Sequence, residues 1–259
     1  MNRITNTLFL CLFIASACGP ADLQEPIVSP ESTNENEMAP VPTPQMPEPM
    51  HRCDPPTLPS EPPTMPEDNP PESEVLTVPV SIVLIQSENI AELNASFDDA
   101  TLLARFEEIN SIWSQANIAF EISNITRVQA TDEARYLEAI QNPSARAAGV
   151  IKRATPSDAL APQTWNFILI EDLGQNPPGV YSCNDGVLIS ARYFGQRDRA
   201  VPANVWAHEL GHSLGLPHLC GAGSNLMCAD GMQPTALVQT QIERARLQAA
   251  SGLPSACGE

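Results

Sequence analysis

Positive charge is scarce in this chain of 259 residues. Thirteen Lys or Arg stand against 31 Asp or Glu, which leaves a formal net charge of -18, and no basic cluster occurs anywhere. Nucleic acid and acidic lipid headgroups would both repel such a polyanion, so we expect no nucleic-acid partner. The hydrophobic content of 42% is nevertheless sufficient for a folded core.

Three kinds of sequence pattern are also missing. There is no C-x-x-C pair, no internal repeat and no EF-hand spacing. The first absence argues against a zinc site built from cysteines. The last leaves calcium without support beyond the acidic loop at 184–185.

Long hydrophobic runs are absent as well, and the apolar run at 8–15 is far too short to span a bilayer. It follows the basic Arg3 and precedes the small residues 15–17 and then Cys18, which is the order of an export signal. This ending resembles the lipobox of bacterial lipoproteins, whose cysteine becomes the lipidated N-terminus. We predict a lipoprotein-type signal peptide over 1–18 with lipidation at Cys18; plain secretion after cleavage is the alternative.

Residues 19–74 hold sixteen of the 26 prolines and twelve acidic residues against one arginine. Such a segment cannot bury enough apolar surface to offset its chain entropy. We predict a disordered stalk that holds the rest of the chain away from a cell envelope or outer membrane, facing outward, with the lipid as the only membrane contact.

Residues 75–259 alternate strand-like and helix-like patterns. Apolar residues recur at helical spacing at Leu102, Leu103, Phe106, Ile109, Ile112 and Trp113. We predict strands over 76–86, 118–129 and 165–173, short edge strands within 179–194, and helices over 96–116, 132–153 (two), 203–216 and 235–251. This order predicts one α/β (α+β) domain over 75–259.

Three of the four histidines lie within HELGHSLGLPH, residues 208–218. His208 and His212 are four residues apart, so a helix places both imidazoles on one face. Gly215 can adopt a positive φ and turn the chain back, which brings His218 to the same point. Three ligands leave the fourth zinc position open, as in catalytic sites.

Glu209 stands beside the first of these ligands. It can take a proton from a zinc-activated water and pass it to a leaving amine. The alternative is that the histidines are ordinary helix-surface or core residues, since a bare H-E-x-x-H also arises by chance. The third histidine and the turn glycine favour the metal site.

The stretch H-E-x-x-H-x-x-G-x-x-H resembles the signature of metzincin metalloproteases, and is most similar to that of the matrixin branch. Met227, in NLM, matches the Met-turn methionine of that family. The resemblance implies a zinc endopeptidase with a twisted mixed sheet, a long backing helix, an active-site helix and a C-terminal helix. It also implies that a peptide binds beside an edge strand drawn from 179–192.

The sequence departs from the matrixins after Met227. Cys228 and the two residues after it replace the usual Pro-x-Tyr, and no tyrosine stands two residues beyond the methionine. The fourth histidine, His51, lies in the stalk, so a second histidine-rich zinc site cannot form. Substrate preference therefore does not carry over from the family.

Four cysteines fall in the predicted domain: Cys183, Cys220, Cys228 and Cys257. Disulfides persist in exported proteins, so we expect two bridges around the zinc loops. All three pairings are open, with a slight preference for Cys183–Cys220 and Cys228–Cys257. Cys53 of the stalk is expected to be a free or intermolecularly paired thiol; the alternative is that it blocks the zinc.

We therefore expect a monomeric zinc endopeptidase that acts on a protein or peptide substrate. Two other functions stay open. One is a zinc hydrolase of cell-wall peptides, and the other is a surface binding module that keeps zinc without catalysis.

Overall fold

The computed structural model describes residues 71, 73–141, 147–174, 177–183, 185–193, 196–219, 224–228 and 234–256, all within one compact unit. The predicted signal peptide with Cys18, almost all of the stalk with Cys53, and also Cys220 and Cys257 lie outside these residues. None of the described helices is both long enough and apolar enough to cross a membrane.

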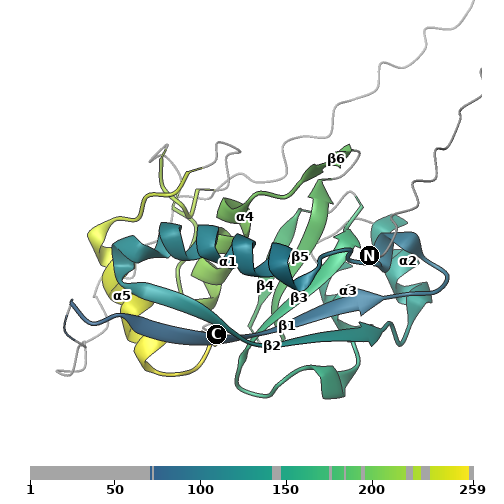
Figure 1. Cartoon of the computed structure of the whole chain (residues 1–259), viewed down its shortest axis with the longest axis horizontal. Coiled ribbons are helices and arrows are strands. Elements are labelled where there is room, and N and C mark those ends of the chain that lie inside the picture. The colour runs from purple at the N-terminus through teal and green to yellow at the C-terminus, as the bar shows by residue number, and fades with distance from the viewer. Residues whose placement is uncertain are drawn as a thin grey trace, which may run out of the picture. The chain divides into compact units, whose positions relative to one another are not determined.

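A mixed sheet forms the centre of the described chain (Figure 1). Its strands are β1 (Leu76–Gln86), β2 (Ile118–Gln129), β3 (Trp165–Asp172), β4 (Gly179–Ser182), β5 (Gly186–Tyr193) and β6 (Gln196–Ala200). The order is β2-β1-β3-β5-β4, with β6 pairing β5 off this path. The pairs β1–β2, β1–β3 and β3–β5 are parallel, whereas β4 and β6 run antiparallel to β5. The predicted mixed sheet is confirmed, and β4 ends the β2-β1-β3-β5-β4 path.

Helices connect these strands and follow them. They are α1 (Asp99–Trp113), α2 (Glu133–Gln141), α3 (Ala147–Arg153), α4 (Ala203–Ser213) and α5 (Gln239–Ala250), with 3-10 turns η1 (Ala91–Leu93), η2 (Ser114–Ala116) and η3 (Ser157–Ala159). Asp98 caps α1, because its carboxylate accepts the backbone N–H of Thr101 at 2.7 Å. The predicted α/β class with a long backing helix is confirmed; Figure 1 shows α1 lying across the strands.

Both faces of the sheet are buried. Successive side chains of β1 point to opposite sides of the sheet, so they divide between two cores. Val80 and Ile82 belong to a core with α1, α4 and α5, which we call the α4 face. Val83 and Ile85 belong to a second core with α2 and α3, the α3 face. Parallel strands covered on both sides read as continuous apolar runs, as β1 and β3 do.

Four details of the sequence prediction were wrong. Strand β5 is interior, between β3 and β4, and β6 was not predicted. The helix predicted over 203–216 ends at Ser213, and the last helix begins at Gln239, four residues later than predicted.

Arg246 of α5 holds the beginning of the described chain in place. Its guanidinium is buried and donates to the backbone carbonyls of Pro71, Glu74, Ala116 and Asn117 at 2.7–3.2 Å. These four carbonyls satisfy a charge that would otherwise be costly to bury. The segment before β1 and the α1–β2 connection are thereby both fixed to the last helix.

Candidate metal centre

Helix α4 supplies two of the three histidines. Trp206, Ala207 and Leu210 are buried in the α4 face and orient the helix. His208 and His212 share the other side, one turn apart, and their Nε2 atoms lie 3.1 Å from each other.

Gly215 ends the helix in a left-handed conformation with φ 78°. Its N–H donates to the carbonyl of His212 at 2.9 Å, and the N–H of Leu216 donates to that of Gly211 at 3.0 Å. This pair of bonds is the Schellman arrangement, in which glycine avoids the clash that a Cβ would cause. The chain therefore reverses under α4, as the sequence predicted.

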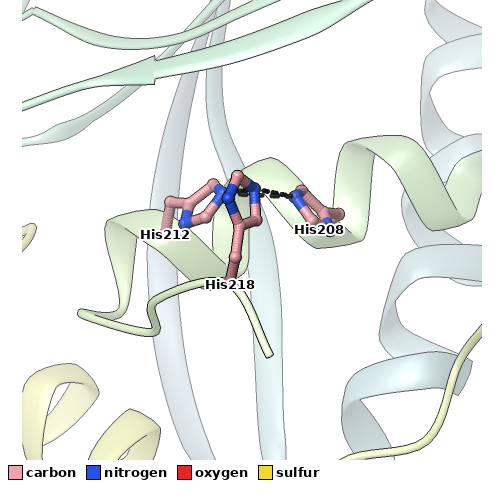
Figure 2. Close-up of side chains that lie close together, drawn as sticks. All are labelled: His208, His212 and His218. Atoms are coloured by element: carbon pink, nitrogen blue, oxygen red, sulfur yellow. Dashed lines mark hydrogen bonds between the residues drawn. The ribbon is translucent and has the colours of Figure 1, made fainter. Parts of the chain in front are cut away.

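His218 lies on the segment that follows this turn. Its Nε2 is 3.2 Å from that of His208 and 3.1 Å from that of His212. Figure 2 shows the three rings pointing toward one another, two from the helix and one from the loop. Among the described residues, these three form the one group of side chains close enough together to hold a metal ion.

Two of the rings are held by backbone carbonyls. His208 Nδ1 lies 2.7 Å from the carbonyl oxygen of Leu226, and His212 Nδ1 lies 2.7 Å from that of Leu216. A carbonyl only accepts, so each Nδ1 must carry the proton and each neutral ring presents a lone pair at Nε2.

The surroundings keep these rings neutral. Burial lowers the pKa of His208, more than its backbone hydrogen bond raises it. Burial, followed by the neighbouring His208, lowers the pKa of His212 to about 3. Neutral imidazoles are the form that binds metals.

This donor set fits zinc. A tetrahedral zinc with nitrogen ligands at about 2.0–2.1 Å separates those ligands by about 3.3 Å, and the three Nε2 atoms lie 3.1–3.2 Å apart. The Nε2 atoms of His208 and His212 carry no proton, because the proton of each ring is on Nδ1. A single proton on the Nε2 of His218 could satisfy one of the three Nε2–Nε2 contacts, which leaves two without a hydrogen bond. A cation that accepts all three lone pairs satisfies them together.

Glu209 is buried between α4 and the edge strand β4. It is only 7% exposed, and the backbone N–H of Tyr181 in β4 donates to its carboxylate. A Cβ added to Gly179 would lie 2.6 Å from the Glu209 Cγ, so β4 passes directly over this side chain. Burial raises the pKa of Glu209 to about 8.

Met227, the predicted Met-turn methionine, is fully buried. A Cβ on Gly211 would lie 2.5 Å from its sulfur, so the glycine makes room for the methionine under α4. The carbonyl of Met227 accepts the N–H of Leu219 at 3.0 Å, one residue after His218. The turn thus supports both the helix and the loop.

The cysteines depart from the prediction. Cys228 carries a free thiol, so the expected Cys228–Cys257 bridge is wrong. Cys183 is disulfide-bonded. Its pairing with Cys220 stays a prediction, because Cys220 lies outside the described residues. In the acidic loop proposed for calcium, Asp185 pairs with Lys152 at 3.4 Å.

Sequence reasoning missed four parts of this site: the carbonyls of Leu216 and Leu226, and the glycines Gly179 and Gly211. Any residue can supply a carbonyl, so no residue type signals it. The two glycines have ordinary negative φ values and are required by neighbours distant in sequence. Gly211 lies inside the quoted motif, where its close contact could have been suspected.

The chain was also compared with known proteins. No protein-family model matches it, and no curated protein matches its sequence. Its fold is similar to that of a promirolysin mutant from Tannerella forsythia, with 16% identity, 70% of this chain and 83% of that chain covered, and a TM-score of 0.46.

Two further solved structures are similar. A chaperone–substrate complex has 12% identity, 69% and 34% coverage, and a TM-score of 0.41. Archaemetzincin from Methanopyrus kandleri has 14% identity, 68% and 94% coverage, and a TM-score of 0.40. These are distant likenesses, so the function proposed below rests on the residues of the site.

Proposed function

We propose that this chain is a zinc-dependent endopeptidase of the metzincin type that hydrolyses extracellular proteins. One observation carries the proposal: three imidazoles converge through Nε2 atoms 3.1–3.2 Å apart, beside a buried glutamate under an edge strand. Within that family, the matrixin branch is supported only by the motif HELGHSLGLPH.

His208, His212 and His218 would hold the zinc. When bound, zinc acts as a Lewis acid that lowers the pKa of water and polarises a carbonyl. Glu209 stands three residues before His212, so it lies on the same side of α4 as the ligand set. It takes the proton of the attacking water and delivers it to the nitrogen of the leaving amine.

Strand β4 would align the substrate. One side of β4 pairs with β5. Its other side is an edge of the described sheet, because β4 is the last strand of the β2-β1-β3-β5-β4 path. An extended peptide can add to such an edge through backbone hydrogen bonds. Because Gly179 and Tyr181 also contact Glu209, the strand that aligns the peptide is the strand that positions the proton carrier.

Export, lipidation at Cys18, an outward-facing stalk and a monomeric state belong to the same proposal. They are supported by the composition of residues 1–74 and by the charge of the chain. Calcium has no support, since the one close group of three or more possible metal ligands among the described residues is the three histidines.

The test is hydrolysis of a peptide library by the purified chain, with and without a zinc chelator. Glu209→Gln should retain stoichiometric zinc and lose about 10²–10⁴-fold in kcat/KM. Glu107→Gln, an exposed glutamate on α1, is the matched control and should remain active. Stoichiometric zinc without cleavage would instead favour a narrow cell-wall hydrolase or a binding module.

A further inference from the structure

Two amide side chains are buried together behind the Met-turn. Asn225 is 2% exposed and Gln241 of α5 is 7% exposed. The Asn225 Nδ2 donates to the Gln241 Oε1 at 2.7 Å, and the Gln241 Nε2 donates to the Asn225 Oδ1 at 3.2 Å. A reciprocal pair of this kind fixes both side chains, because each end is donor and acceptor to the other.

Each amide also holds a backbone N–H of its own segment. The Asn225 Oδ1 accepts the N–H of Met227 at 2.9 Å, which closes the turn. The Gln241 Oε1 accepts the N–H of Val238 at 3.0 Å, at the start of α5. The pair therefore joins the Met-turn to the last helix, and breaking it leaves buried polar groups without partners.

The turn that this pair fixes contacts two of the three ligands. The carbonyl of Leu226, next to Asn225, accepts the Nδ1–H of His208 at 2.7 Å. The carbonyl of Met227 accepts the N–H of Leu219, the residue after His218, at 3.0 Å. A displacement of the turn would therefore rotate one ligand ring and shift the segment that carries another.

We propose that Asn225 and Gln241 are positioning residues for the metal centre. Their amide pair sets the place of the Leu226 carbonyl, and through it the orientation and tautomer of His208. This inference rests on the proposed zinc site but does not require the peptidase activity. It assigns to α5, which carries none of the ligands, a part in metal affinity.

Two variants of the full chain separate this role from simple packing. Gln241→Met keeps most of the side-chain volume and removes the amide. Asn225→Ser keeps an oxygen that can accept the Met227 N–H in a similar turn, but cannot reach Gln241. Gln239→Met is the matched control, since Gln239 is on the same helix and exposed, and its amide donates to the exposed carboxylate of Glu243 at 3.2 Å.

The measurement is zinc affinity by competition with a chromophoric chelator, well below the melting temperature of each variant. We expect Gln241→Met and Asn225→Ser to bind zinc about 10–100-fold more weakly, as loss of an outer partner of a metal ligand typically causes. The double variant should lose little more than the larger single loss, because the two residues act through one another. The control should bind as wild type does.

A second readout is the ¹⁵N spectrum of the His208 imidazole in the zinc-free protein, where both variants should show a mixture of tautomers. Lowered melting temperature with unchanged zinc affinity and unchanged tautomer would overturn the inference and leave the zinc site standing. A wild-type chain that binds no zinc would overturn the proposed function and this inference together.

Discussion

On both faces of the sheet, side chains donate hydrogen bonds to backbone carbonyls, but the consequences differ between the faces. On the α3 face, the Tyr136 hydroxyl donates to the carbonyl of Asp172, and the Lys152 ammonium donates to that of Gly186. On the α4 face, His208 and His212 also donate to backbone carbonyls. Unlike the tyrosine hydroxyl and the lysine ammonium, the imidazole has a second nitrogen. The hydrogen bond from Nδ1 orients each ring so that its Nε2 points to the place where the three Nε2 atoms meet. A side-chain hydrogen bond to a backbone carbonyl therefore stabilises the fold on the α3 face and orients the metal-site histidines on the α4 face.

The largest expected difference separates fold from function. His212→Ala on the α4 face should abolish zinc binding and peptide cleavage, since it removes one of three ligands. The zinc-free variant should melt within a few degrees of zinc-free wild type, because the ring supports the metal rather than the core.

Ile151→Ala on the α3 face is the counterpart. Ile151 is 2% exposed, and its truncation should lower the free energy of unfolding by about 2–5 kcal/mol. The kcat/KM of the folded fraction should stay at the wild-type value. Chemical denaturation and zinc titration of both variants check the pair; a loss of zinc affinity in Ile151→Ala would contradict the separation of the faces.

The next effect concerns two glycines of the same backbone conformation. Gly215 has φ 78° and Gly252, at the end of α5, has φ 72° with no atom within 4 Å of an added Cβ. Either substitution by alanine should cost about 1–2 kcal/mol of stability, because an L-residue is strained there.

Only Gly215→Ala should also weaken zinc binding, since Gly215 sets the Leu216 carbonyl under His212. Thermal melts of the zinc-free proteins and chelator competition measure the two effects separately. Equal zinc affinity in both variants would mean that the reversal after α4 tolerates strain without moving the ligands.

Much of the metal centre follows from local rules, and the rest from tertiary contacts. A helix places residues four apart on one face, and a glycine after it can reverse the chain, so the three ligands were predictable from HELGHSLGLPH. The carbonyls of Leu216 and Leu226 and the Asn225–Gln241 pair were not, because they depend on how separate segments meet.

The same division holds for the fold. The continuous apolar runs of β1 and β3 identified buried strands. Strand β6 and the interior place of β5 depend on pairing between strands, which periodicity does not specify. Leu103 follows the helical spacing of the buried residues of α1 and is nevertheless 54% exposed, because apolar spacing alone does not determine the width of a buried stripe.

A smaller effect is expected at two tyrosines, one on each face. Tyr181 of β4 donates its hydroxyl to the carbonyl of Ser255, whose own N–H donates to the carbonyl of Ser213 at the end of α4. Tyr136→Phe and Tyr181→Phe should each lower stability by about 0.5–1.5 kcal/mol.

Tyr181→Phe should in addition lower kcat/KM by up to about tenfold, since 1.36 kcal/mol at the transition state is a factor of ten. The reason is that β4 holds Glu209 through its backbone. Steady-state kinetics of both variants on one peptide measure the change in kcat/KM. Equal kcat/KM in Tyr136→Phe and Tyr181→Phe would contradict the proposal that β4 positions Glu209.

The last effect appears only in alkaline solution. Burial lowers the pKa of Lys152 from 10.5 to about 8, against the opposing effect of Asp185. Between these values the unfolded chain holds a proton that the folded chain has released, so the free energy of unfolding rises with pH. The rise should be at most about 1.4 kcal/mol per pH unit.

Lys152→Met should remove this rise while leaving kcat/KM near the wild-type value at neutral pH. Denaturant titrations at several pH values from 7 to 10 compare the two proteins. A difference between them that is independent of pH would mean that Lys152 stays protonated in the folded chain throughout.

Arg246 also determines how the domain would respond to mechanical load. A pull on the chain ahead of residue 71 reaches the two contacts of Arg246 with the carbonyls of Pro71 and Glu74 before it reaches the hydrogen bonds of β1. The same guanidinium also donates to the carbonyls of Ala116 and Asn117, which fix it to the α1–β2 connection. A pull from the N-terminal side would therefore strain the contacts with Arg246 before it strains the strand that leads into the sheet.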